Sequence, residues 1–344
     1  MQGKFEKIKR IKKNISLLDF PLLSLTYLRQ KLYDLSVIKK VVKNWPEVIL
    51  FRLGLKKRFI MKLRNGKEIK IKDQQDYFNF WDSEDSLILL LKDVKFNKKK
   101  KQVEFKYKNH LILFYLKGDI SLIRGQFIDE EYRWLNVKGK EVVDVGANIG
   151  DTAIYFALNG AKHVYAFEPY PFSYKIALKN IKLNKLENKV TLLNEAISKE
   201  NKTIYIDGNY KNIGSDDLKE FKKGKKIRVT TLEEIIKRFK LKNAVLKMDC
   251  EGCEYCSILN TPNEVLRNFE QIMLEYHYGY LNLKKKLEEA GFKVKVSLPR
   301  YFFNDGAQNP HMLLGYLYAQ RLSKARLGKA RLGKIEIIGS EKLK

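Results

Sequence analysis

Hydrophobic residues in the second half of the chain fall into short runs separated by amphipathic stretches. The runs have the length of buried strands and lie at residues 141–145, 164–167, 190–193, 244–248 and 271–274. Helical spacing fits the stretches at residues 152–158, 174–183 and 232–239. Such alternation predicts a parallel sheet covered by helices on both faces. A helix at 281–290 and strands at 293–297 and 312–318 complete the series, and we expect the last strand to be antiparallel.

The beginning of the chain shows other patterns. Residues 1–50 place Leu, Ile and Val at helical spacing among lysines, which predicts short helices interrupted at Pro21 and closed by Trp45-Pro46. Apolar and basic residues alternate over residues 58–72 around Asn65-Gly66, which predicts a hairpin with a two-residue type I′ turn.

A second alternating pair, residues 103–107 and 111–116, folds about Lys108-Asn109, and the lysines at 98–101 before it form an exposed linker or turn. We therefore expect a domain boundary near residue 100. Residues 1–100 then form a small α+β accessory region with basic character, and residues 101–320 form the main α/β domain. Residues 321–344 form a basic tail in which Lys-Ala-Arg-Leu-Gly occurs twice, at 324–328 and 329–333.

The composition of the 344 residues indicates a folded, basic protein. Hydrophobic residues make up 44% of the chain, which is enough for a substantial core and excludes general disorder. The formal net charge is +28 and is concentrated at the ends: residues 1–136 carry 31 Lys and Arg against 16 Asp and Glu, and residues 321–344 carry 8 against 2. Such flanks attract nucleic acid, anionic lipid or acidic glycans, or form only a solvated surface.

The sequence also bears on the compartment. No apolar stretch reaches the roughly 20 residues that span a membrane, and no apolar run of a secretory signal follows the basic N-terminus. Cys250, Cys253 and Cys256 are the only cysteines, which gives no disulfide framework and suits a reducing compartment. We therefore expect a cytoplasmic protein.

The strand at 141–145 runs through a glycine turn into a helix. The segment reads Asp144-Val145-Gly146-Ala147-Asn148-Ile149-Gly150-Asp151-Thr152. Gly146 permits backbone torsions closed to other residues, and Gly150 lets the helix N-terminus approach a ligand closely. Exposed amides there suit a negatively charged or electron-rich group. The spacing G-x-x-x-G differs from the G-x-G-x-x-G of nicotinamide sites and from the phosphate loop, so neither cofactor is expected.

The next strand ends in Phe167-Glu168-Pro169. A carboxylate at that edge of a sheet can accept hydrogen bonds from both hydroxyls of a ribose, as the acidic residue of dinucleotide folds does. The alternative is a capping or surface Glu. The neighbouring glycine turn favours the ligand role.

These two motifs resemble those of class I S-adenosylmethionine-dependent methyltransferases, and the longer pattern resembles the FkbM family among them. Further residues carry the resemblance, in order: Asn180, Leu183-Asn184, Glu195-Ala196-Ile197, Thr231-Leu232, residues 247–254 and Glu275-Tyr276-His277. The resemblance covers about residues 105–318. It implies a Rossmann-like sheet of seven strands with the last one antiparallel.

The resemblance also implies S-adenosylmethionine as cofactor and methylation of a hydroxyl, often on a sugar or polyketide-like product. It implies that the methionine part of the cofactor is held by Asp144, Gly146, Ala147, Asn148, Gly150, Asp151 and Thr152. The ribose is then expected at Glu168 and Pro169, and the adenine near Asn194, Glu195 and Ala196.

Candidate catalytic residues follow the strand at 244–248, where the transferable methyl should lie. Asp249 is a candidate for binding the cofactor's amino group, for positioning the acceptor or for taking its proton, and Glu251 is a further candidate base. By residue type His277 is the best general base because its ordinary pKa lies near neutrality. A histidine that is only structural is the alternative.

The cysteines are spaced C-x-x-C-x-x-C, which suggests a metal or redox site. Zinc would need a fourth ligand, so we expect small buried thiols and no metal.

The sequence therefore predicts an O-methyltransferase that acts on a hydroxyl of a glycan, glycolipid or related small molecule, with contact to an anionic membrane or polyanion through the basic flanks. One rival is a nucleic-acid methyltransferase, which the charge favours. The missing Asn/Asp-Pro-Pro-aromatic motif at residue 249 disfavours it. The other rival is a basic binding protein on a degenerate methyltransferase fold, which the intact Asp144, Gly146, Gly150 and Glu168 disfavour.

Overall fold

The computed structural model describes residues 35–81, 83–115, 120–206, 222–297, 299–303, 311–322 and 336–337. The helices expected before residue 35 and the tandem repeat at 324–333 lie outside these ranges. The chain divides between Glu131 and Tyr132 into two compact units, here called the N-terminal and C-terminal units.

The second half of the N-terminal unit is a three-stranded antiparallel sheet. Its strands are β3 (Lys92–Asn97), β4 (Gln102–Tyr107) and β5 (His110–Tyr115). The lysines at 98–101 form the turn between β3 and β4, so the boundary expected near residue 100 falls inside this sheet. The helix α6 (Ile120–Phe127) follows, and its Phe127 packs against Phe105 and Phe114. This packing joins the sheet to the residues before the division at Glu131.

The first half of this unit combines helices with one hairpin. Its elements are α3 (Trp45–Arg52), β1 (Phe59–Lys62), β2 (Glu68–Ile71), α4 (Gln74–Trp81) and α5 (Glu84–Leu90). Trp45-Pro46 begins α3 rather than ending a helix, because proline suits the first helical turn, where its missing N–H costs nothing.

The hairpin of β1 and β2 is confirmed, but its turn is not type I′. The Leu63 amide donates to the Lys67 carbonyl at 2.8 Å, which leaves a three-residue loop. Within that loop Gly66 has a positive φ (91°) and Asn65 does not.

The C-terminal unit is built on the expected sheet of seven strands. Their spatial order is β8 (Val190–Leu193), β7 (His163–Phe167), β6 (Glu141–Val145), β12 (Ala244–Met248), β13 (Phe269–Tyr276), β16 (His311–Arg321) and β14 (Phe292–Val296). The first five are parallel, and β16 is antiparallel to both of its neighbours, which confirms the fold class. Two short strands extend the sheet: β15 (Arg300–Phe303) pairs with β16, and β17 (Glu336–Ile337) pairs with β14.

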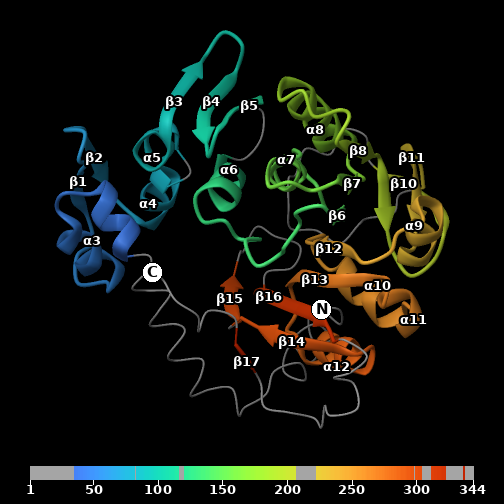
Figure 1. Cartoon of the computed structure of the whole chain (residues 1–344). Coiled ribbons are helices and arrows are strands. Elements are labelled where there is room, and N and C mark those ends of the chain that lie inside the picture. The colour runs from blue at the N-terminus through green and yellow to red at the C-terminus, as the bar shows by residue number, and fades with distance from the viewer. Residues whose placement is uncertain are drawn as a thin grey trace. The chain divides into compact units, whose positions relative to one another are not determined.

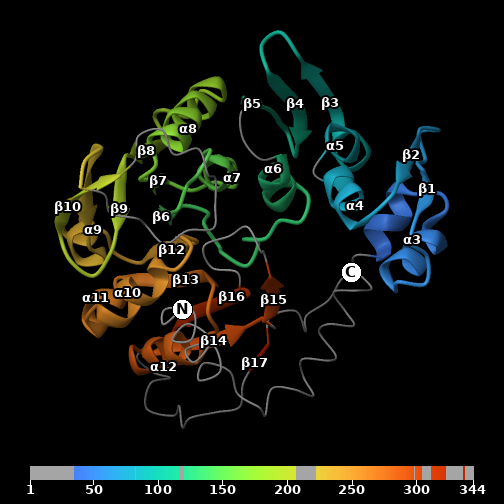
Figure 2. The same cartoon turned by 180° about the vertical axis from the view of Figure 1, so that it is seen from behind.

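Helices cover both faces of this sheet. They are α7 (Asp151–Leu158), α8 (Pro171–Leu183), α9 (Leu232–Phe239), α10 (Cys253–Asn260), α11 (Asn263–Leu266) and α12 (Leu281–Glu289). Val143 and Val145 of β6 share a buried cluster with α9 to α12, whereas Asp144 between them bonds to α7. Because side chains alternate along a strand, α7 lies on the opposite face from that group (Figure 1 and Figure 2). No described helix is long and apolar enough to cross a membrane.

A small sheet beside the main one was not expected from the sequence. Its strands are β9 (Glu195–Ile197), β10 (Lys202–Ile206) and β11 (Lys225–Thr230), with β11 in the middle. They bury a separate apolar cluster, which consists of Ala196, Ile204, Ile206, Ile227 and Val229.

Candidate active site

The predicted site residues follow strands that end side by side. In the register of the sheet, Val145 lies between Phe167 of β7 and Met248 of β12. The residues that follow these strands therefore leave the sheet at one edge. In open α/β sheets, ligands bind beyond the carboxyl ends of the strands, where the chain crosses to the two sides of the sheet.

The first turn at this edge is the glycine turn, residues 146–150. Gly146 has φ 78°, and a Cβ there would lie 1.8 Å from the Asp249 carbonyl oxygen. The Asp249 amide in turn donates to the Val145 carbonyl at 3.1 Å. Glycine is therefore required at 146 because the turn after β12 packs directly against it.

Glycine is required at position 150 because another helix of the protein, and not a ligand as we expected, lies close to it. Gly150 has φ 84° at the start of α7, and a Cβ there would lie 3.2 Å from Cα of Ala177 in α8. The close approach is thus to a helix, where we expected a ligand. Ala147 is fully buried, and Asn180 of α8 holds the turn by donating to the Ile149 carbonyl at 2.9 Å.

A buried ion pair lies beneath the glycine turn. Oδ1 of Asp144 lies 3.1 Å from Nζ of Lys247, and Oδ2 accepts a hydrogen bond from Thr152 at 2.6 Å. Lys247 also donates to the Gly146 carbonyl at 2.8 Å. Burial lowers the pKa of Lys247, but Asp144 and the nearby Asp249 and Asp151 outweigh burial and raise it. Asp144 and Thr152, expected to hold the cofactor, are thus bonded to the protein itself.

Two oxygens, one in the glycine turn and one on the first residue of α7, lack partners. Oδ1 of Asn148 and Oδ1 of Asp151 are buried and make no hydrogen bond within the described part of the chain. Burial raises the pKa of Asp151 to about 8. Buried polar atoms without partners are costly, so these two oxygens fit a ligand that carries donors or positive charge.

Glu168 lies beside this turn and is buried. Its carboxylate accepts hydrogen bonds from the Asn148 amide at 2.9 Å and the Tyr170 amide at 2.8 Å. Burial raises the pKa of Glu168 to about 7, although these amides act in the opposite direction. Pro169 contributes its carbonyl, which accepts from the Asn194 side chain at 2.8 Å.

The residues expected near the adenine have other contacts. Both carboxylate oxygens of Glu195 accept hydrogen bonds from Arg238, at 3.0 and 2.9 Å. The Ala196 side chain is buried in the small sheet. Asn194 links this segment to Glu168 by donating to its carbonyl at 2.8 Å.

The second turn at the edge, residues 249–252, follows β12 and is called here the acidic turn. Glu251 has φ 58° and Gly252 has φ 122°. Glu254 is fully buried behind it and accepts hydrogen bonds from the Cys250 and Gly252 amides, both at 2.9 Å. The acidic turn is therefore fixed from within by a carboxylate.

His277 brings three carboxylates together. Its Nε2 lies 3.2 Å from Oε2 of Glu251 and 3.8 Å from Oδ1 of Asp249, and its Nδ1 lies 3.3 Å from Oε1 of Glu254. Burial lowers the pKa of His277, but Glu254 and Glu251 outweigh it and raise that pKa well above its usual range. The reason for expecting His277 as general base, a pKa near neutrality, does not hold in this surrounding. A protonated imidazole cannot accept a proton.

The cysteine expectation is wrong for two of the three residues. Cys250 and Cys253 form a disulfide, because the acidic turn brings their Cα atoms to 5.5 Å. Cys256 has a free thiol, and all three side chains are half-buried rather than buried.

Lys247 and Glu254 lie within the motif at residues 247–254, but the sequence predicted no separate role for either. A lysine within an otherwise apolar buried strand was the available signal for Lys247, which lies opposite Asp144 in the register. Tyr132 was also missed. Its hydroxyl donates to Oδ2 of Asp249 at 3.3 Å, and its ring lies 5.4 Å from Nζ of Lys247.

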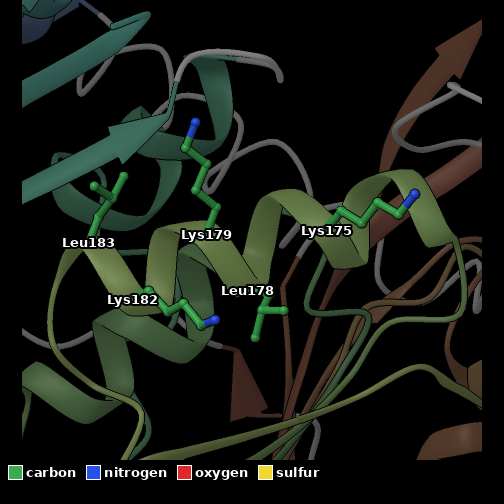
Figure 3. Close-up of a pocket in the computed structure, with 5 residues that line it drawn as sticks. All are labelled: Lys175, Leu178, Lys179, Lys182 and Leu183. Atoms are coloured by element: carbon green, nitrogen blue, oxygen red, sulfur yellow. The ribbon is translucent and has the colours of Figure 1, made fainter.

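A shallow hollow of about 340 Å³ lies on α8 and contains none of these residues. It is lined by Lys175, Leu178, Lys179, Lys182 and Leu183, and Figure 3 shows Leu178 and Lys182 pointing to the same side of the helix.

Comparison with known proteins identifies the domain. Residues 144–294 match the methyltransferase FkbM domain family. The chain carries an FkbM methyltransferase domain. The match includes the glycine turn, Glu168, the acidic turn and His277, as expected.

Individual relatives are more distant. Over 69 residues the chain is 43% identical to ribosomal protein L11 methyltransferase of Carboxydothermus hydrogenoformans, a match that covers 20% of this chain and 23% of that protein. Among solved structures, ribosomal protein L11 methylase of Lactobacillus delbrueckii is 17% identical over 60% of this chain and 81% of that one, with a TM-score of 0.34. The tRNA m1G37 methyltransferase of M. jannaschii is 16% identical over 66% and 59%, with a TM-score of 0.33.

Proposed function

We propose that this FkbM domain uses S-adenosylmethionine to methylate a hydroxyl of a glycan, glycolipid or related small molecule. The observation that carries the proposal is the grouping of Glu168 with two partnerless oxygens, those of Asn148 and Asp151, at one sheet edge. A cationic donor with an ammonium and two ribose hydroxyls supplies what these groups lack.

The residues fit the cofactor as follows. Asn148 and Asp151 would receive its ammonium, which offers donors to their oxygens, while the buried Lys247 keeps Asp144 neutralised below. The Glu168 carboxylate is fixed by two amides and retains acceptor capacity for the ribose hydroxyls. Asn194 would border the adenine through its fixed position beside Glu168.

The bound cofactor supplies an electrophilic methyl group on a positively charged sulfur. The acceptor oxygen would take this methyl group in exchange for the sulfur, which would keep the bonding electrons, and the hydroxyl proton would pass to a carboxylate of the acidic turn or to water. Asp249 and Glu251 are 30% and 29% exposed, so an acceptor can reach their carboxylates. Most of the rate gain would come from aligning the oxygen, methyl carbon and sulfur.

The acidic turn favours a neutral acceptor. Asp249, Glu251 and Glu254 gather where the acceptor would bind, and while no cation is bound among them they would repel the phosphates of a nucleic acid. The basic flanks would then serve surface contact with a membrane or polyanion and not the reaction. A protein is a second candidate acceptor, because one relative is named as a methyltransferase of ribosomal protein L11.

Cofactor binding is tested first by calorimetric titration. Glu168→Ala should weaken S-adenosylmethionine binding by about 1.5 to 3 kcal/mol, the range for hydrogen bonds to a charged group. Glu187→Ala, an exposed carboxylate outside the site, should leave affinity unchanged. Absence of binding by the parent chain would contradict the proposal as a whole.

The acceptor is tested with isotopically labelled donor. Mass spectrometry should find the label on a hydroxyl of a glycan, glycolipid or small alcohol. Label on a protein amine or a nucleotide alone would reject the hydroxyl assignment and leave the methyltransferase assignment standing.

A further inference from the structure

Three ligand atoms of metal-binding type meet at the acidic turn. They are Oδ1 of Asp249, Oε2 of Glu251 and Nε2 of His277, and all lie within 4.8 Å of one another. Asp249 and Glu251 lie in the turn that follows β12 and His277 directly follows β13, so these two neighbouring strands set their spacing. His277 is buried, while the two carboxylates are partly open to solvent, which leaves one side free for further ligands.

The surroundings of Nδ1, the other ring nitrogen of His277, favour metal binding through Nε2. Nδ1 of His277 is buried without an aligned hydrogen bond and faces Oε1 of Glu254 at 3.3 Å. Glu254 is itself fully buried and fixed by the Cys250 and Gly252 amides. A metal-bound histidine typically donates its other ring N–H to a carboxylate, which directs the lone pair of the remaining nitrogen to the metal. Glu254 can select that tautomer.

The charge of the cluster also calls for a cation. Three carboxylates surround one imidazole, so a surplus of two negative charges remains even when His277 is protonated. The ammonium of Lys247 interacts electrostatically with Asp249, but its ion pair and hydrogen bonds are with Asp144 and with the carbonyls of Val145 and Gly146. It does not reach Glu251 or His277 with a hydrogen bond or ion pair among the described contacts.

We propose that Asp249, Glu251 and His277 bind a divalent cation of the Mn²⁺ type, with Glu254 positioning His277. Two carboxylate oxygens and one imidazole nitrogen with an open side suit this ion, since carboxylate-rich sites favour Mn²⁺ and Mg²⁺ and the imidazole favours a transition metal over Mg²⁺. The cysteines are not part of this site, because Cys250 and Cys253 are joined in a disulfide and offer no thiolate to a metal.

The use of the cation in catalysis, unlike its binding, rests on the function proposed above. An acceptor hydroxyl that enters the open side of the cation becomes more acidic and is oriented toward the methyl group. Because Nε2 binds a cation only in the neutral imidazole, His277 then acts as a ligand, and the cation supplies the activation expected of a general base.

The binding test uses the purified full chain after chelator treatment, titrated with MnCl₂ and followed by the electron paramagnetic resonance signal of free Mn²⁺. We expect one tightly bound ion per chain. Glu251→Gln and Asp249→Asn should each weaken binding at least about tenfold, and Glu254→Gln by about 10- to 100-fold. The matched control is Glu233→Gln, an exposed carboxylate paired with Lys237 on α9, which should change nothing.

Circular dichroism and S-adenosylmethionine titration show that each variant is folded. No Mn²⁺ binding up to millimolar concentration, or equal binding by the parent and Glu251→Gln, would overturn the inference. Methyl transfer that continues in the presence of chelator, without Mn²⁺ binding, would overturn the inference and leave the proposed function intact. Mn²⁺ binding without any S-adenosylmethionine binding would support the cation site and contradict the proposed function.

Discussion

The glycine turn after β6 and the acidic turn after β12 have similar backbone conformations. Each leads from a parallel strand into a helix whose first residue follows a glycine with positive φ, Gly150 at 84° and Gly252 at 122°. Each also holds one residue other than glycine in the left-handed region, Asn148 at 45° and Glu251 at 58°.

The two turns differ in how their negative charge is compensated. The carboxylate under the glycine turn has a built-in cation, because Lys247 lies 3.1 Å from Asp144. The acidic turn instead shares His277 among three carboxylates. Similar backbone geometry therefore serves different chemistry: Lys247 neutralises the carboxylate under one turn, and the other turn retains negative charge for what binds there.

Removing the built-in cation should have the largest effect. Lys247→Met leaves Asp144 buried without its partner, so we expect the free energy of unfolding to fall by about 3 to 5 kcal/mol. Urea unfolding followed by circular dichroism measures it. The double variant Lys247→Met/Asp144→Asn should recover part of this loss, because it removes the unpaired charge as well. A single variant as stable as the parent would show that the pair does not stabilise the glycine turn.

The pH dependence of stability tests the buried acid of the glycine turn. The folded chain raises the pKa of Asp151 from 3.8 to about 8 by burial, so it keeps a proton that the unfolded chain has released. This contribution to stability is complete below pH 3.8 and is lost as the pH rises to about 8. At about 1.4 kcal/mol per pKa unit, even half of the shift contributes about 3 kcal/mol.

Asp151→Asn should therefore flatten the fall in unfolding free energy between pH 4 and 8, measured by urea titration at several pH values. The same slope in variant and parent would refute the assignment. S-adenosylmethionine should also bind the parent more tightly as the pH rises through this range, because the cation favours the ionised carboxylate.

Disturbing the contact between the two turns should lower the free energy of unfolding by less than the changes described above. Gly146→Ala puts a Cβ 1.8 Å from the Asp249 oxygen, whereas Gly139→Ala at a similar φ (70° against 78°) meets nothing within 4 Å. The difference between these variants isolates the clash from the torsional strain. We expect Gly146→Ala to be less stable than Gly139→Ala by about 1 to 3 kcal/mol, measured by urea unfolding. Equal losses would mean that the turns can move apart freely.

The covalent clamp on the acidic turn should have the smallest effect. The disulfide joins residues three positions apart, so it closes a very short loop and stabilises the fold by about 2 kcal/mol at most. Comparing the melting of the parent with that of Cys250→Ala/Cys253→Ala, with and without reductant, measures it. Reductant should lower the melting temperature of the parent and leave that of the double variant unchanged, because the variant retains only Cys256. An equal change in both would show that the effect of reductant does not come from this disulfide.

The sequence predicted the main sheet because its signals are local. The runs at β6, β8 and β12 and the helix α9 have the expected bounds, since continuous apolar runs and strong amphipathicity mark buried elements. The strands of the small sheet gave no such signal: β9 has three residues and follows Asn194 directly. Their pairing, with β11 between β10 and β9, depends on contacts distant in sequence.

The site was predicted in outline and not in its bonding. The motif residues do gather at one edge, but the sequence could not show that Asp144 is paired with Lys247 or that Glu195 is paired with Arg238. It also placed His277 by its ordinary pKa, whereas the three carboxylates come from residues whose approach only the fold determines. The disulfide likewise depends on the torsions of the acidic turn rather than on cysteine spacing.

The packing of Gly146 on the Asp249 carbonyl limits how this domain can be engineered. Recombining it with a relative at a crossover between β6 and β12 would bring together two turns that were selected with different partners. A chimaera that inherits residues 144–152 and 247–254 from one parent keeps the backbone contact, and one that splits them risks the clash. Acceptor range is therefore better altered through side chains outside the two turns than by changing the length of either turn.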